Sequence, residues 1–278
     1  MPKIKQDHWE LTYTWSASSG LRLGVVEYRG QRVLHSAAVP FIFVNYQGGP
    51  WGPYTDELRS LANEVTHRDI VRGFDLQVTY DLYGPDYRYD HVWRFHRDGQ
   101  FGTFIVIHGP GEELLGRHTY QVPFRFDLDI SGAEGDTFQR WQGYWADVST
   151  EGQQRPAYPH SPEYDWQIID KATNRRAMIR AHRGDDAECW PQHYRDSERW
   201  GSWGGVQATP PGSAGSVPAL YADGQTVVNT DIVVWYLAHV SSRDLMATCG
   251  PSFQLAGFGE DHDDGAEEHH NHDHDHNH

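Results

Sequence analysis

Apolar and polar residues alternate with a period of two along much of this chain. Between Val122 and Ile130 every second residue is apolar, and proline, arginine and aspartate separate them. Because successive side chains of a β-strand point to opposite faces, this alternation predicts a strand with one buried face. A second stretch has the same period and ends at the turn Arg97-Asp98-Gly99; its apolar face would carry Tyr87, Tyr89, His91, Trp93 and Phe95.

The pattern predicts further strands in both halves of the chain: a meander within residues 9–47, and single strands at 74–82, 165–169, 177–181 and 230–239. One short helix is expected, over Tyr54–Glu64. Residues 135–162 and 184–224 are expected to form long irregular connections, which in a compact domain often serve function or assembly. Many strands, few short helices and no strand–helix alternation predict an all-β fold, a large antiparallel β-sandwich.

Composition limits the cellular setting. The chain has no run of about 18 apolar residues, so no membrane-spanning helix is expected. The N-terminal residues lack the apolar segment of a secretory signal. The two cysteines, Cys189 and Cys249, are too few for a disulfide framework and lack the spacing of a metal finger. These features predict a cytoplasmic protein with two free thiols.

The formal net charge of −16 is divided unevenly along the chain. Residues 259–278 hold eight acidic residues, seven histidines and neither lysine nor arginine, and thus half of the net charge. We therefore divide the chain into a folded domain, 1–258, and a disordered tail, 259–278. The domain is mildly acidic, which disfavours nucleic acid and anionic membranes as partners.

The histidines of the tail are typical ligands of Cu(II), Ni(II) and Zn(II). A purification tag is the alternative explanation, but the mixed Asn, Asp and His pattern differs from a uniform tag. We favour the hypothesis that the tail collects metal for a site in the domain.

Four motifs occur in an order typical of one family. They are VNYQGG followed by PYTD, DYRYDHVWRFHRDG, RHTYQVPFRFDLDISG and NTDIVVWYLAHV. Together they resemble the catalytic domain of the copper-containing amine oxidases over residues 20–250, without the usual N-terminal domains of that family. The resemblance implies a β-supersandwich fold and a homodimer.

The resemblance also implies roles for individual residues. Tyr87 aligns with the tyrosine that becomes topaquinone, Asp56 with the catalytic base and Tyr46 with the tyrosine hydrogen-bonded to the quinone. The copper histidines align with His118, Tyr120 and His239. Three residues depart from the family pattern: Asp86 replaces asparagine, Arg88 replaces an acid, and Tyr120 replaces the middle histidine.

By this resemblance the protein is a copper-dependent oxidase that uses O₂ to oxidise a small amine, with a quinone formed from Tyr87. One alternative is a mononuclear copper oxidase or oxygenase without the quinone, in which Tyr120 supplies a phenolate or His108 a third imidazole. Another is a non-catalytic metal-binding protein on the same scaffold. Each candidate residue could also have a purely structural role. Tyr87 would then be a packed phenol and Asp56 a solvated carboxylate, and His91 and His96 would lie on the surface of their strand.

Overall fold

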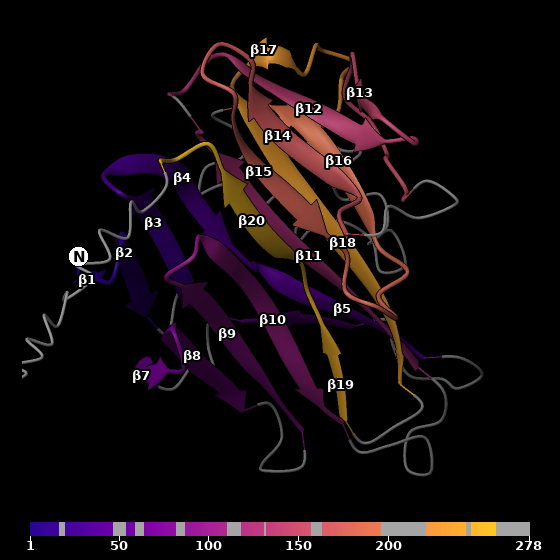
Figure 1. The fold of residues 1–278 in the computed structure, drawn as a ribbon. Helices are drawn as coiled ribbons and strands as arrows, with labels where there is room; N and C mark the ends of the chain where they lie inside the picture. Colours follow the sequence, from indigo (N-terminus) through magenta and orange to yellow (C-terminus); the bar gives the residue numbers. More distant parts are fainter. Residues whose placement is uncertain are drawn as a thin grey trace, which may run out of the picture.

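Two antiparallel sheets pack face to face in the computed structural model (Figure 1). The structure describes residues 1–16, 20–46, 54–58, 64–81, 87–109, 118–130, 132–156, 163–195, 221–242 and 246–259; within these ranges it leaves out the side chains of residues 16, 46, 54, 55, 57, 118 and 242. Over these ranges every strand pairing is antiparallel and no helix occurs. The predicted all-β antiparallel sandwich is therefore confirmed. None of the described segments is a helix able to cross a membrane.

The first sheet follows the order β1-β2-β3-β4-β11-β18-β16, and β5 pairs with both β11 and β6. Its strands are β1 (Lys3–Gln6), β2 (Trp9–Ser16), β3 (Gly20–Tyr28), β4 (Gln31–Ala38), β5 (Phe41–Tyr46), β6 (Tyr54–Glu57), β11 (His118–Leu128), β16 (Glu188–His193) and β18 (Ile232–Ser242).

The second sheet follows the order β13-β12-β14-β15-β20-β10-β9-β8-β7, with β17 paired to β12 and β19 to β10. Its strands are β7 (Thr66–Ile70), β8 (Gly73–Asp81), β9 (Arg88–His96), β10 (Gln100–His108), β12 (Asp136–Trp141), β13 (Trp145–Asp147), β14 (Trp166–Asp170), β15 (Arg175–Arg180), β17 (Val228–Thr230), β19 (Met246–Cys249) and β20 (Ser252–Ala256).

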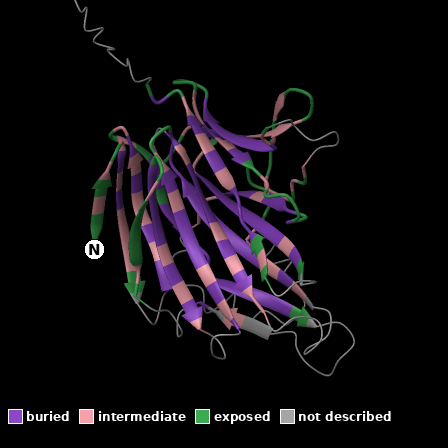
Figure 2. Ribbon diagram, turned by 60° about the horizontal axis from the view of Figure 1, so that its bottom comes forward, coloured by how far each residue is buried: buried purple, intermediate pink, exposed green. Residues whose placement is uncertain are grey.

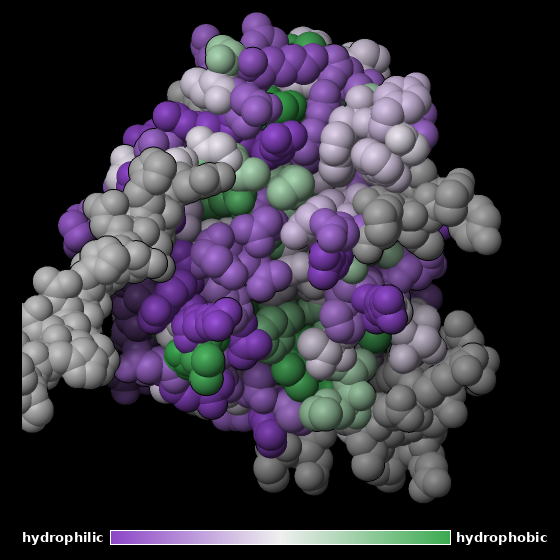
Figure 3. Space-filling view, viewed as in Figure 1, coloured by the Kyte–Doolittle hydropathy of each residue, from purple (hydrophilic) through white to green (hydrophobic). Residues whose placement is uncertain are grey.

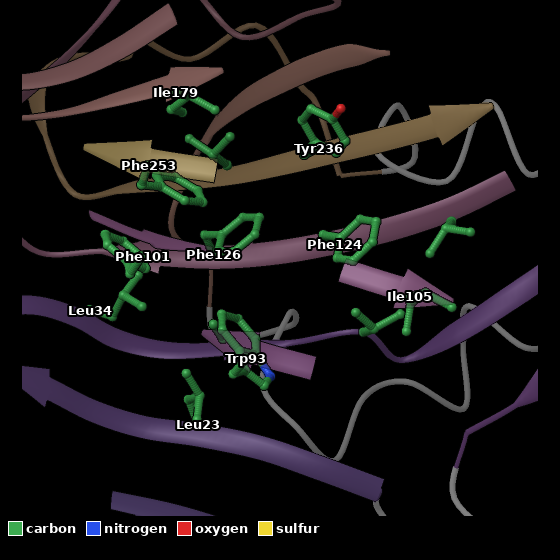
Figure 4. Packing of buried hydrophobic residues seen from close by; sticks show 14 of the residues in the cluster. Leu23, Leu34, Trp93, Phe101, Ile105, Phe124, Phe126, Ile179, Tyr236 and Phe253 are labelled. Carbon is green, nitrogen blue, oxygen red and sulfur yellow. The ribbon is translucent and has the colours of Figure 1, made fainter. Parts of the chain in front are cut away.

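Aromatic side chains from both sheets fill the space between them. Trp93 of β9 lies 6.0 Å from Phe126 of β11, and Phe126 lies 4.8 Å from Phe253 of β20, measured between ring centroids. Figure 4 shows these rings converging between the strands. The tyrosine-bearing face predicted for β9 is confirmed, since all five of its residues are buried. Figure 2 shows buried and partly exposed residues alternating along neighbouring strands.

The burial of β11 differs from the prediction. The polar face was expected to meet solvent, yet Arg125, Asp127 and Asp129 are at most 3% exposed. Ion pairs offset part of the cost of burying these charges: Arg32 lies 2.8 Å from Asp129, and Arg125 lies 3.5 Å from Asp127. Both faces of β11 are therefore buried at these positions, which residue alternation alone does not reveal.

Three sequence predictions about local structure are wrong. Residues Tyr54–Glu57 form β6 rather than the start of a helix, because they pair with Phe41–Val44 of β5. The expected irregular connection over 135–162 contains β12 and β13, and that over 184–224 contains β16. Pairing with neighbouring strands overrides weak local preferences in all three places.

Candidate functional site

A buried carboxyl–phenol cluster joins the two sheets. Asp56 of β6 belongs to the first sheet, whereas Tyr89 lies in β9 of the second sheet and Tyr87 directly precedes that strand. Both phenols donate a hydrogen bond to Asp56 Oδ2, Tyr87 at 3.1 Å and Tyr89 at 2.5 Å, and the two phenol oxygens are 2.9 Å apart. The structure thus brings together Tyr87 and Asp56, two residues that the sequence placed in one site.

The charge state of Asp56 is set by opposing effects. Burial raises the pKa of its carboxyl, and the hydrogen bonds from Tyr89 and Tyr87 work in the opposite direction. Burial and the nearby Asp56 carboxylate hold the pKa of Tyr89 well above its usual value, so Tyr89 remains a hydrogen-bond donor. Within the described residues Asp56 has no cationic partner, and its second oxygen, Oδ1, accepts no hydrogen bond.

Tyr89 belongs to this cluster, but the sequence analysis did not assign it to the site. Its spacing of two from Tyr87 was visible and predicted a shared face, but the resemblance gave it no role. The strand pairing of β9 and the position of β6 opposite it were needed to show that both phenols reach one carboxylate. The shared face was therefore the signal that could have identified Tyr89.

Tyr120 of β11 borders the cluster. Its ring lies 6.3 Å from that of Tyr89 in an edge-to-face arrangement, and its side chain is fully buried. His91, two residues beyond Tyr89, is also fully buried, which corrects its interpretation as a surface residue. Its Nε2 lies 2.9 Å from Thr103 Oγ1, and burial lowers its pKa to about 3, so the ring is neutral.

His239 does not share a face with Tyr120. Strands β11 and β18 pair without a register shift, so that Tyr120 opposes Val240 and His239 opposes Gln121. Paired residues share a face and successive residues alternate, hence Tyr120 and His239 point to opposite sides of the sheet. His239 instead lies near Glu188, with 3.9 Å between Nε2 and Oε1. The register therefore places Tyr120 and His239 on opposite faces of the sheet, and a shared ion site remains a prediction from the resemblance.

The other candidate residues from the sequence add no described metal ligand to this cluster. Tyr46 and His118 pair with each other across β5 and β11, but their side chains lie outside the described part of the structure. His108 Nε2 lies 2.7 Å from Asp90 in a pair outside the Asp56–Tyr87–Tyr89 cluster, so it does not replace the missing imidazole.

The described donors do not fit the copper centre implied by the resemblance. On β18, the residues that oppose Tyr120 and His118 are Val240 and Ser242, and neither is a histidine. In the parts of the chain that the structure describes, no group of three or more His, Cys, Asp or Glu side chains is arranged to hold a metal ion. Copper(II) favours a set of imidazole nitrogens, and among the described residues of β9 His91 is the histidine that shares the inner face with Tyr89.

Comparison with known proteins identifies the fold. No protein-family model and no curated protein matches the sequence. Among solved structures, the chain is similar to a copper-containing benzylamine oxidase from Hansenula polymorpha, with 13% identity and a TM-score of 0.66, and to an amine oxidase from Aspergillus nidulans, with 14% identity and a TM-score of 0.64. A lysyl oxidase from Pichia pastoris is 11% identical with a TM-score of 0.64.

In each comparison the match covers 92% of this chain and between 51% and 60% of the other chain. At such low identity the similarity concerns the fold and not the chemistry. The tyrosine-bearing strand β9, the strand β11 beside it and the two sheets that enclose them therefore form a copper amine oxidase-like β-sandwich.

Proposed function

We propose that the protein binds a small primary amine, in its ammonium form, at the Asp56 carboxylate. The observation that carries this proposal is the unpaired charge of Asp56: Oδ2 accepts hydrogen bonds from both phenols, Oδ1 accepts none, and the described residues supply no cation. A partly buried carboxylate without a counter-charge is costly, and an ammonium ligand would offset that cost.

The two phenols prepare the carboxylate for such a ligand. Tyr87 and Tyr89 hold Oδ2 in place, which leaves Oδ1 to accept a charge-assisted hydrogen bond from the ammonium. The raised pKa of Asp56 also makes its carboxylate a stronger proton acceptor than that of an ordinary aspartate. The similarity to enzymes named benzylamine oxidase and lysyl oxidase supports an amine as the ligand class.

A copper-dependent amine oxidase is the second candidate. It is favoured by the 3.1 Å contact between Tyr87 and Asp56, the pair that the resemblance assigns to the cofactor and the base. The register of β18 argues against it. Val240 and Ser242 oppose Tyr120 and His118, so His239 points to the other side of the sheet. A copper ion with a quinone at Tyr87 would supply the oxidation of the amine by O₂.

Benzylamine binding tests the first candidate. Titration calorimetry at neutral pH should show binding to the wild-type protein and a loss of about tenfold or more in Asp56→Asn, because a charge-assisted hydrogen bond contributes roughly 1.5–3 kcal/mol. Asp69→Asn removes one exposed acidic charge elsewhere and serves as the control. Equal affinity in the wild type and Asp56→Asn would contradict the proposal.

Copper reconstitution in air separates the two candidates. The amine-binding proposal predicts a colourless protein that does not react with phenylhydrazine. A visible quinone absorbance that disappears in Tyr87→Phe would instead establish the oxidase. Sedimentation analysis of the same samples tests the homodimer implied by the resemblance.

A further inference from the structure

A cleft of about 660 Å³ lies on the outer side of the second sheet, where one strand position is interrupted. Strand β20 pairs with Gln100–Gly102 of β10 and β19 pairs with Ile105–His108, and Gly250 and Pro251 separate the two. Gly250 has a φ of +133°, and a Cβ there would lie 2.3 Å from the Thr103 carbonyl oxygen. Glycine is thus required at the break that forms the cleft floor.

The charge of this cleft is opposite to that of the chain. None of the described residues that line it is acidic, although the chain has a net charge of −16. Five basic residues do: Arg94, His96, Arg180, His182 and Arg183. Figure 3 shows mostly hydrophilic atoms over the face that carries β9, β10 and β15, with a hydrophobic area beside them.

The arginines differ in how far they are already neutralised. Arg94 forms two 2.8 Å hydrogen bonds with Asp75, so most of its charge is compensated. Arg180 donates through Nε to the Glu163 carbonyl oxygen, and its guanidinium lies 4.9 Å from the centroid of the Tyr164 ring. Among the described residues its charge has no carboxylate partner. Arg183 is exposed at the cleft and, among the described residues, has no ion pair or hydrogen bond.

A buried network holds His182 beside these arginines. Asp185 is fully buried, and its Oδ1 lies 3.1 Å from His182 Nδ1. Its Oδ2 accepts hydrogen bonds from the Tyr236 hydroxyl at 2.6 Å and from the Gly250 backbone N–H at 2.9 Å. The imidazole is therefore fixed through Nδ1, and Nε2 is the nitrogen left to bind a ligand.

Apolar groups form the remaining wall. Phe104 of β10 and Pro251 line the cleft, and the Arg94 guanidinium lies 5.3 Å from the centroid of the Phe104 ring. A cationic rim above an apolar wall suits a ligand with a negative head and an apolar body.

We propose that this cleft binds a small organic anion, a carboxylate or phosphate attached to an apolar body. Arg183, Arg180 and His182 Nε2 contact the anionic head, and Phe104 and Pro251 contact the body. The cleft lies outside the sandwich, whereas Asp56 lies between the sheets, so the two sites bind different ligands independently.

Phenyl phosphate and benzoate are suitable probes, with inorganic phosphate as the probe that lacks an apolar body. Both aromatic anions should bind to the full chain and shift the backbone amide resonances of residues 180–183, 248–250 and 252. The double variant Arg180→Gln, Arg183→Gln should bind both about tenfold more weakly or worse. Both side chains are exposed, so the variant should fold as the wild type does.

Arg72→Gln is the matched control, because Arg72 is exposed, forms no ion pair with the described residues and does not line the cleft. It should leave binding unchanged. Undiminished binding in the double variant, or no change in the named resonances, would overturn the proposal. Equal affinity for inorganic phosphate and phenyl phosphate would overturn the role of the apolar wall. Benzylamine binding at Asp56 should be the same in all these variants.

Discussion

Replacing Tyr89 by phenylalanine tests whether the carboxyl–phenol cluster carries charge in the folded protein. The substitution keeps the buried ring and removes the 2.5 Å hydrogen bond to Asp56 together with the 2.9 Å contact to the Tyr87 hydroxyl. A hydrogen bond to a charged group contributes roughly 1.5–3 kcal/mol, and one between neutral groups about 1 kcal/mol. We therefore expect a loss of about 2 kcal/mol in unfolding free energy when Asp56 is ionised, and about half of that when it is protonated.

The sign of the pH dependence follows from the raised pKa of Asp56. A carboxyl whose pKa is higher in the folded state binds its proton more tightly there, so stability falls as pH rises from the usual aspartate value to the folded value. Phenylalanine removes one of the bonds that favour the carboxylate, which raises the pKa of Asp56 further. The destabilisation by Tyr89→Phe should therefore grow with pH.

Urea unfolding of the wild type and the variant, measured from below the usual aspartate pKa of 3.8 up to about pH 9, gives this difference directly. Tyr80→Phe is the control, since it removes another fully buried phenol, whose oxygen accepts a hydrogen bond from Leu21 N–H. Its cost should not vary over the same range. A cost for Tyr89→Phe that is equally independent of pH would refute the reasoning that Asp56 ionises in the folded protein.

Three other predictions concern the cleft and the tail. Gly250→Ala should lower the unfolding free energy by more than about 1 kcal/mol, measured by urea denaturation, because its Cβ would lie 2.3 Å from the Thr103 carbonyl oxygen. The hydrogen bond from His182 to Asp185 raises the pKa of His182, so an NMR titration should find it above its usual value in the wild type and lower in Asp185→Asn. Stability from this pair is complete below the usual histidine pKa and is lost as pH rises through the folded value. Deletion of residues 259–278 should lower bound Cu(II), measured by elemental analysis at limiting metal, and unchanged occupancy would contradict the metal-collecting hypothesis.

Local alternation was sufficient to predict the strands that bury one face. The burial of Tyr89 and Trp93 in β9, and of Tyr87 directly before it, was predicted correctly. A period of two is a property of the extended backbone alone. The same alternation gave a wrong prediction for β11, where Arg125 and Asp127 are polar but buried. Which strands lie in the centre of a sheet depends on pairing with strands that are distant in the sequence. The alternation within one strand does not predict that pairing.

The candidate metal ligands also show that sequence patterns do not determine how distant strands pair. A shift of one residue in a strand moves a side chain to the other face of the sheet. The motif match placed His239 beside Tyr120, but the register of β11 with β18 pairs Tyr120 with Val240. Motif spacing across a gap of variable length does not determine the register, and the register alone decided which residues share a face.

The sequence by itself determined that the chain is an antiparallel β-protein, which strands carry an aromatic inner face, and that Tyr87 and Asp56 are candidate site residues. Only the tertiary structure decided that Asp56 meets Tyr87 and Tyr89 across two sheets, that His239 faces away from them, and that a basic cleft forms at Gly250. The physical reason is that strand formation follows from neighbouring residues, whereas sites arise from the register and packing of strands that are distant in the chain.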